Sequence, residues 1–283
     1  MTMVVRDEAD VLSTNLDYHL GQGVDLVLVT DHSSTDRTPD ILADYAHSGR
    51  VRVWREDEAA YRQRSWVARM LEAGRREHGV DWVLHGDADE FWVPLTGSLR
   101  DVFSAVPEQY GYLVVPSRLF LPASGGSEPF HRHMVVYRPL RRAWGKVAQR
   151  PAAGSRLSPG NHFLSSASRR APDAGTVEIH HFQTRSFEQL ARRAERVAAS
   201  IGLGGDLGPH TRRLIEAHRT GRLDAFYETV ALTPEQTADG LESGELVLDP
   251  RMHALLTGGQ PGRRESPQAQ AVLSRLWQRV SSS

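Results

Sequence analysis

The sequence predicts an α/β protein in which a doubly wound, mostly parallel sheet is flanked by helices and followed by a helical C-terminal segment. Two observations indicate this fold class. Strand-like and helix-like patterns alternate three times within the first ninety residues, which is typical of βαβ units with right-handed crossovers. Beyond residue 205, the pattern is helical and is interrupted by glycine.

Local patterns define the elements of the first half. Residues 1–5, 25–30, 51–54 and 81–86 read as four strands, and the apolar run at 25–30 is expected for a strand covered on both faces. Residues 11–20 and 61–78 carry apolar side chains at helical spacing. Thr38 and Pro39 suit the N-cap and the first position of another helix.

The pattern changes after Trp92. We expect a short helix at 99–105, strands at 111–121, 133–138, 144–148 and 176–182, and a helix that begins at Ser186 with Gln189 completing a capping box. Residues 150–173 are rich in Pro, Gly, Ser and Arg, which predicts an excursion loop.

Composition excludes several classes of protein. The 283 residues include no cysteine, so a disulfide framework, a thiolate zinc site and a cysteine nucleophile are excluded. A formal net charge of -1 argues against a dedicated nucleic-acid binder. No run approaches the ~18 apolar residues of a membrane helix, and the first residues lack the pattern of a secretory signal. We expect a cytoplasmic protein, and peripheral association with a membrane stays open.

Polar loops follow the first, second and fourth predicted strands. They are residues 6–8, 31–36 and 87–90. In open parallel sheets, ligands bind beyond the carboxyl ends of the strands. The three loops should therefore lie along one edge of the sheet and form the candidate site.

Asp87 and Asp89 are two residues apart at the end of an apolar strand. In an extended segment they would point the same way and repel each other unless a cation lay between them. Mg²⁺ and Mn²⁺ take oxygen ligands and complete their shell with phosphate oxygens and water. The pair therefore predicts a metal–diphosphate site. The alternative is a polar turn without a ligand, because Asp is common in turns.

The other loops offer further candidates. Asp31 can accept two parallel hydrogen bonds from a base edge or from ribose hydroxyls. Asp36 either contacts the ligand or braces its Ser/Thr-rich turn. Arg6 could meet a phosphate, and Glu8 either contacts the ligand or supplies negative charge to the first turn of the next helix.

A late segment, HHFQTRS, adds basic candidates. His180 and His181 lie on a predicted strand and should point to opposite faces, so that only one can reach the site. A histidine can join two carboxylates around a borderline metal, although a strand histidine can also be purely structural. Arg185 precedes the predicted helix start, a position that suits an anionic group.

Taken together, five segments resemble the family 2 glycosyltransferases of the GT-A fold, in the bacterial branch related to the family 92 group. The segments are RDEADVL, YHLGQGVD, VTDHSSTDRT, DADEFW and HHFQTRSFEQL, which occur in the family's order and cover roughly residues 3–193. One departure concerns the second loop, where His32 and Ser33 stand in place of an acid and glycine found in many relatives.

The resemblance implies a nucleotide-sugar donor, a divalent cation (Mn²⁺ or Mg²⁺) and inversion at the anomeric carbon. It implies that Asp31 contacts the base, that Asp87 and Asp89 hold the metal and the diphosphate, and that His181 is a further metal ligand. It also implies a catalytic domain over residues 1–200, with a nucleotide-binding half at about 1–92 and an acceptor half at about 93–200. Residues 201–283 would form a helical extension with a partly flexible tail.

The sequence shows no clear motif for the catalytic base. Glu90 is the candidate because it adjoins the metal pair, and Glu128 and Glu178 are alternatives. The acceptor, whether a glycan, a lipid-linked sugar or a small molecule, is not indicated. Two other functions stay open: a metal-dependent nucleotidyltransferase or phosphohydrolase with the same acidic strand ends, and a non-catalytic protein that binds nucleotide-sugars.

Overall fold

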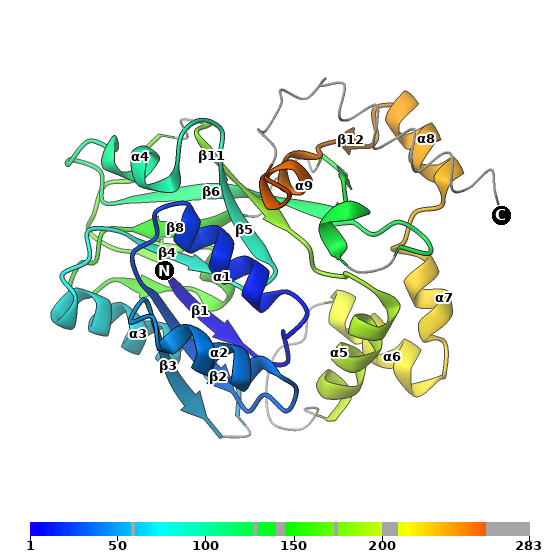
Figure 1. Ribbon diagram of the computed structural model, residues 1–283, viewed down its shortest axis with the longest axis horizontal. Coiled ribbons are helices and arrows are strands. Elements are labelled where there is room, and N and C mark those ends of the chain that lie inside the picture. Colours follow the sequence, from blue (N-terminus) through cyan, green and yellow to red (C-terminus); the bar gives the residue numbers. More distant parts are fainter. Residues whose placement is uncertain (58–59, 127–128, 140–144, 173–174, 200–208, 259–283) are drawn as a thin grey trace. The chain divides into compact units, whose positions relative to one another are not determined.

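The computed structural model describes residues 1–57, 60–126, 129–139, 145–172, 175–199 and 209–258 (Figure 1). Its chain divides into two compact units. The first unit comprises Met1–Ser117 and Arg142–His181, and the second comprises Arg118–Arg141 and Phe182–Ser283. The domain boundary expected near residue 200 falls within residues 200–208, outside the described ranges, so the predicted domain limits stay a prediction.

The first unit is built on a sheet with four parallel strands. These strands are β1 (Thr2–Val5), β2 (Val27–His32), β3 (Val51–Glu56) and β4 (Val83–Gly86), in the order β4-β1-β2-β3. Beyond β4 the sheet continues through β8 (Gly145–Gln149) to β6 (Tyr112–Leu121), with antiparallel pairing. The predicted α/β class is confirmed, and the arrangement fits a GT-A-like fold.

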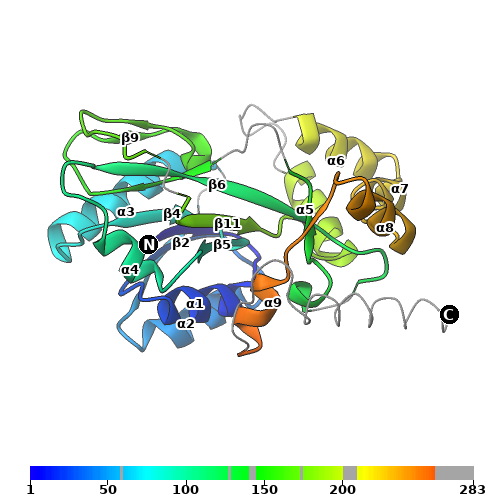
Figure 2. The ribbon, with the colours of Figure 1, turned by 90° about the horizontal axis from the view of Figure 1, so that it is seen from above.

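Helices cover both faces of this sheet. They are α1 (Leu12–Gly21), α2 (Thr38–Ala46), α3 (Gln63–Glu77) and the short α4 (Leu99–Ser104). Helix α3 lies on one face, and α1 and α2 lie on the other (Figure 2). Val67 and Met70 of α3 pack with Leu28 of β2 in a buried cluster. This burial of apolar surface holds the strand ends in fixed positions.

A strand that the sequence patterns did not indicate follows the DAD segment. It is β5 (Glu90–Pro94), and it pairs antiparallel with β11 (Val177–His181) in a register that sets Glu90 opposite His181. The Asn15 side chain of α1 donates hydrogen bonds to the carbonyl oxygens of Ala88 and Glu90, both at 2.9 Å. The start of β5 is therefore tied to a helix as well as to a strand.

Some element limits differ from the sequence-based predictions. Helix α2 begins at Thr38, and its N-cap is Arg37 rather than Thr38. The expected loop at 150–173 contains a small antiparallel hairpin of β9 (Arg156–Leu157) and β10 (Leu164–Ser165). The predicted strand at 133–138 is reduced to β7 (Val136–Tyr137), because a 3₁₀ turn at Phe130–Arg132 and a following turn occupy the preceding residues.

The second unit is mainly helical, as predicted. Its helices are α5 (Phe187–Ala199), α6 (Pro209–Arg219), α7 (Leu223–Glu228), α8 (Pro234–Glu242) and α9 (Arg251–Leu256). Leu190, Ala194 and Leu214 form its buried helical core. Strand β7 pairs with the end of β6 and with β12 (Val247–Leu248). None of the helices in the described ranges is long and apolar enough to cross a bilayer.

Candidate active site

The acidic loops of the first unit gather at the carboxyl ends of the parallel strands, as the sequence predicts. Val5 of β1 is in register with Asp31 of β2, and Met3 of β1 is in register with Gly86 of β4. Asp31 and Asp87 therefore emerge on either side of β1. Two strand spacings separate their backbones, which corresponds to about 10 Å.

The DAD segment is a turn and not an extended strand end. The Glu90 amide donates a hydrogen bond to the Asp87 carbonyl oxygen at 3.1 Å, which closes a tight turn between β4 and β5. The extended backbone from which the common direction of the two aspartates was predicted is absent, because residues 88 and 89 form a turn. Asp87 and Asp89 instead have different partners.

Asp87 is paired with Lys146 of β8, a residue that sequence analysis did not single out. The Lys146 Nζ lies 2.6 Å from Asp87 Oδ2 and 3.0 Å from Glu90 Oε2, and the lysine side chain is 3% exposed. Burial alone would lower the pKa of Lys146, but the Asp87 and Glu90 carboxylates together raise it well above its usual value. The ammonium therefore stays charged inside the acidic cluster.

Glu90 is enclosed by the chain. Its Oε2 accepts hydrogen bonds from the Lys146 ammonium and, at 3.1 Å, from the Asp87 backbone amide. Its Oε1 lies 3.9 Å from Nδ1 of His181. Burial raises the pKa of Glu90, and Lys146 opposes that shift. Of the two carboxylate oxygens, Oε1 is the one not bound by lysine.

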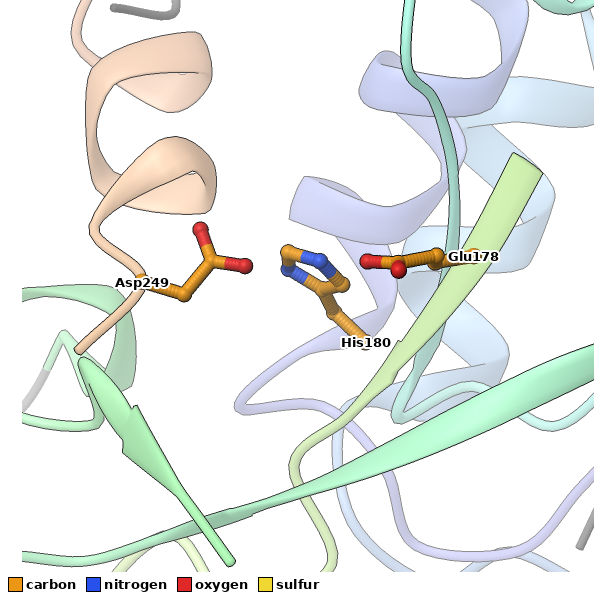
Figure 3. A group of neighbouring side chains, drawn as sticks. All are labelled: Glu178, His180 and Asp249. Atoms are coloured by element: carbon orange, nitrogen blue, oxygen red, sulfur yellow. The ribbon is translucent and has the colours of Figure 1, made fainter. Parts of the chain in front are cut away.

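His181 rather than His180 meets the acids. Its Nε2 lies 3.4 Å from Asp89 Oδ2. Burial alone would lower the pKa of His181, but Asp89 and Glu90 raise it above its usual value. His180 and Glu178, which are two residues apart on β11, project from the other side of the strand (Figure 3). Asp249, also drawn there, belongs to the second unit, where it accepts a 2.8 Å hydrogen bond from Arg251.

The Asp89–His181 pair fits a divalent cation. Two neighbouring ligands of an octahedral ion, with bonds of about 2.1 Å, lie about 3 Å apart. The 3.4 Å separation of Asp89 Oδ2 and His181 Nε2 is close to that value. The carboxylate oxygen is a ligand that suits Mg²⁺ or Mn²⁺, and the imidazole nitrogen is one that suits a borderline transition metal. Asp87 could add only its Oδ1 while Lys146 holds its Oδ2.

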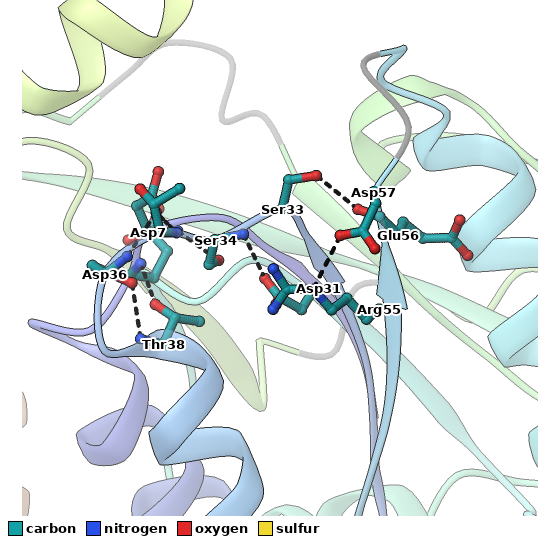
Figure 4. Close-up of polar contacts among 11 residues, drawn as sticks. Asp7, Asp31, Ser33, Ser34, Asp36, Thr38, Arg55, Glu56 and Asp57 are labelled. Atoms are coloured by element: carbon teal, nitrogen blue, oxygen red, sulfur yellow. Dashed lines mark hydrogen bonds and ion pairs between the residues drawn. The ribbon is translucent and has the colours of Figure 1, made fainter.

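The loops after β1 and β2 are fastened together by Asp7 and Asp36 (Figure 4). Asp7 Oδ1 accepts a hydrogen bond from the Thr35 amide at 2.7 Å. The Asp36 carboxylate accepts from the Ala9 amide at 3.1 Å and from the Thr38 amide at 2.8 Å. Asp36 thus braces the loops, one of the two roles that the sequence left open.

Glu8 also takes part in this bracing. Its backbone amide donates to the Thr38 hydroxyl at 2.9 Å, and its carbonyl oxygen accepts hydrogen bonds from two amides at the start of α1. Asp7 and Ser33 have left-handed φ angles of 53° and 54°. Such angles are uncommon for residues other than glycine, so the two turns are strained. The bracing contacts hold them in place.

Asp31 is buried at the end of β2 and faces its own loop. Its Oδ1 accepts from the Ser34 amide at 3.2 Å, and its Oδ2 lies 3.4 Å from Nη1 of the half-exposed Arg55 (Figure 4). The next residue, His32, packs its ring 4.7 Å from the ring of Trp66 and 5.6 Å from that of the exposed Tyr61. Because consecutive side chains of a strand point to opposite faces, these rings lie on the face of β2 opposite to the Asp31 carboxylate.

Two predicted arginines have different surroundings. Arg6 follows β1, between the strands that carry Asp31 and Asp87, and its buried Nε has no hydrogen-bond partner within the described part of the chain. Arg185 belongs to the second unit, where its Nη1 donates to the Phe182 carbonyl oxygen at 3.1 Å. Its predicted contact with a ligand stays a prediction.

Another hollow lies at the opposite edge of the sheet. A cavity of about 470 Å³ is lined by Leu26, Trp82 and Phe103, among others, near the amino ends of the parallel strands. It contains none of the acidic strand ends.

Glu128, an alternative base candidate, lies outside the described residues.

Comparison with known proteins gave no match to a family model and none to a curated protein. Among solved structures, residues 1–349 of TarS from S. aureus share 16% identity and a TM-score of 0.43, covering 81% of this chain and 72% of that one. The same protein with UDP-GlcNAc gives 13% identity and a TM-score of 0.41, covering 77% and 70%. Mannosyltransferase PcManGT from Pyrobaculum calidifontis, with GDP-Man and Mn²⁺, gives 17% and 0.38, covering 98% and 85%. TM-scores this low carry no weight for function.

Proposed function

We propose that this protein is a metal-dependent glycosyltransferase that moves a sugar from a nucleotide-sugar to an acceptor hydroxyl with inversion. The observation that carries the proposal is the meeting of Asp89 with His181, 3.4 Å apart, beside Asp87 at the carboxyl edge of the parallel strands. Asp31 emerges at the same edge on the other side of β1. The family resemblance of these segments supports the same function.

Residues on both sides of β1, at the carboxyl edge of the parallel strands, bind the donor. Asp31, which is buried at the end of β2, receives the base or ribose. Arg6, whose buried Nε is unpaired within the described structure, meets a phosphate between the two sides. Asp36 and Glu8 act indirectly by holding the loops. Arg185 is proposed, on the resemblance alone, to contact the donor.

Asp89 and His181, with Asp87 Oδ1, hold the divalent cation. When bound, such a cation stabilises the negative charge that develops on a nucleoside diphosphate as it leaves. The side chains fix the position of the diphosphate, so the anomeric carbon is held in one orientation toward the acceptor.

The acceptor hydroxyl must lose its proton as it attacks an oxocarbenium-like carbon. Glu90 is the proposed base, acting through Oε1, the oxygen that Lys146 does not bind. Glu178 is less suited because it projects from the face of β11 opposite to His181.

A thermal-shift panel of nucleoside diphosphates, with and without Mn²⁺, tests the proposal. Specific donor binding stabilises the native state by mass action, so one diphosphate should raise Tm only when Mn²⁺ is present. Turnover of nucleotide-sugars should then release nucleoside diphosphate. Release of monophosphate would favour a nucleotidyltransferase or phosphohydrolase, and binding without turnover across many acceptors would favour a non-catalytic protein.

A further inference from the structure

Lys146 is the only lysine among the 34 lysine and arginine residues of the sequence. Its ammonium lies within 3.0 Å of two carboxylates in the candidate site, and its side chain is almost fully buried. At this buried position the chain has an ammonium, although its other basic side chains of this class are guanidiniums. An ammonium is a compact point charge with three donors, whereas a guanidinium is a wide planar fork.

The charges of the cluster explain what that ammonium does. Asp87, Asp89 and Glu90 bring three carboxylates together between β4 and β5. Lys146 neutralises the Asp87 and Glu90 side of the turn, and His181 faces Asp89 on the other side. The acidic cluster is therefore divided into two parts. On the Asp89 side, His181 supplies a nitrogen that can bind a cation when the imidazole is neutral.

We propose that Lys146 is a positioning residue that holds Asp87 Oδ2 away from the divalent cation and so sets how tightly the cluster binds that cation. The inference rests on the proposed metal-dependent function. An ammonium 2.6 Å from a ligand oxygen repels a cation that approaches the same carboxylate. Asp89 and His181 are then the principal ligands, and Asp87 is shared between lysine and cation.

Mn²⁺ binding without donor tests this inference, with free Mn²⁺ measured from its electron paramagnetic resonance signal. In Lys146→Gln the affinity for Mn²⁺ should rise about tenfold, because the competing positive charge is gone. Lys146→Arg keeps the charge and should stay within about threefold of the parent protein. A purely structural role would weaken Mn²⁺ binding in both variants, and equal or weaker binding in Lys146→Gln overturns the inference.

The parent protein offers a second measurement that does not depend on a variant folding. With lysine labelled with ¹³C at Cε, the chain gives one methylene signal, because it has one lysine. Mg²⁺ should shift that signal, and the shift should be absent in Asp89→Ala. An unmoved signal under saturating Mg²⁺ overturns the inference while leaving the metal site intact. Failure of the parent protein to bind Mn²⁺ or Mg²⁺, with or without nucleoside diphosphate, overturns both the inference and the proposed function.

Discussion

Asp87 and Asp89 differ in what they contact, although both belong to the motif that the sequence analysis singled out. Asp87 is held by an ammonium, and Asp89 faces an imidazole. The same difference separates the two adjacent histidines, since His181 meets the acids and His180 lies on the other side of β11. At the scale of single residues, the partner rather than the residue type decides the role.

Asp89→Ala should abolish metal-dependent donor binding without unfolding the protein, because the half-buried carboxylate is a principal ligand and its loss leaves no cavity in the apolar core. His181→Ala should weaken donor binding less, since it removes one of several ligands. Calorimetric titration of nucleoside diphosphate with Mn²⁺ measures both effects. Normal donor affinity in Asp89→Ala would refute the assigned metal site.

Glu90→Gln tests the proposed base. If Glu90 takes the acceptor proton, kcat should fall by about 10²- to 10⁴-fold while Mn²⁺-dependent binding of nucleoside diphosphate persists. The amide keeps the shape of the side chain and can still accept from Lys146. A kcat close to that of the parent protein would mean that Glu90 only anchors the lysine.

Strained turns and their braces matter at the scale of elements. The loop after β1 holds the loop after β2 through Asp7, whose backbone is in the left-handed region and whose carboxylate accepts from the Thr35 amide. These contacts therefore join the loop that carries Arg6 to the loop that follows Asp31.

Asp7→Ala should lower the free energy of unfolding by about 2 kcal/mol, because alanine disfavours a left-handed φ and leaves the Thr35 amide without its acceptor. Asp7→Asn is the matched control. Asparagine tolerates this backbone and retains an acceptor oxygen, so it should cost less than about 1 kcal/mol. Urea denaturation measures both, and equal losses would show that the turn geometry is not the cause.

Two buried, neutral histidines make the stability of the first unit depend on pH. His19 Nε2 accepts a hydrogen bond from the Trp92 amide at 3.1 Å, so in the neutral ring the proton is on Nδ1, which faces Asn15. His85 is buried between Thr2 and Gln149. Burial lowers the pKa of each to about 3. Protonation of His19 would break one of the hydrogen bonds that tie α1 to β5.

The sign of the pH effect follows from these lowered values. Above pH ~6.5, the two histidine rings are neutral in both the unfolded and the folded state. Their contribution to the free energy of unfolding is then at its full value. As the pH falls below ~6.5, only the unfolded state gains protons until about pH 3, so stability falls by about 1.4 kcal/mol per pH unit per histidine. Between pH 7 and 5 the loss should be about 2 kcal/mol for each ring.

His19→Gln should therefore lose less stability between pH 7 and 5 than the parent protein, by about 2 kcal/mol, because glutamine does not titrate. Urea denaturation at the two pH values measures the difference. The double variant with His85→Gln should show twice the reduction. An unchanged pH dependence in the single variant would mean that folding does not lower the pKa of His19.

Local patterns along the chain were enough to predict the alternation of strands and helices, the acidic loops at the carboxyl ends of parallel strands and the candidate aspartates. These features are set by local periodicity and by the rule that parallel strands end at one edge. Three features became visible only in the folded chain. The DAD segment is a turn, β5 pairs with β11 and sets His181 beside the acids, and Lys146 enters the cluster from β8. Those contacts join residues 56 to 92 positions apart, and sequence spacing carries no signal of strand register or of a side chain's direction across a sheet. The rarity of lysine was visible in the sequence, but its meaning came from the carboxylates that surround it.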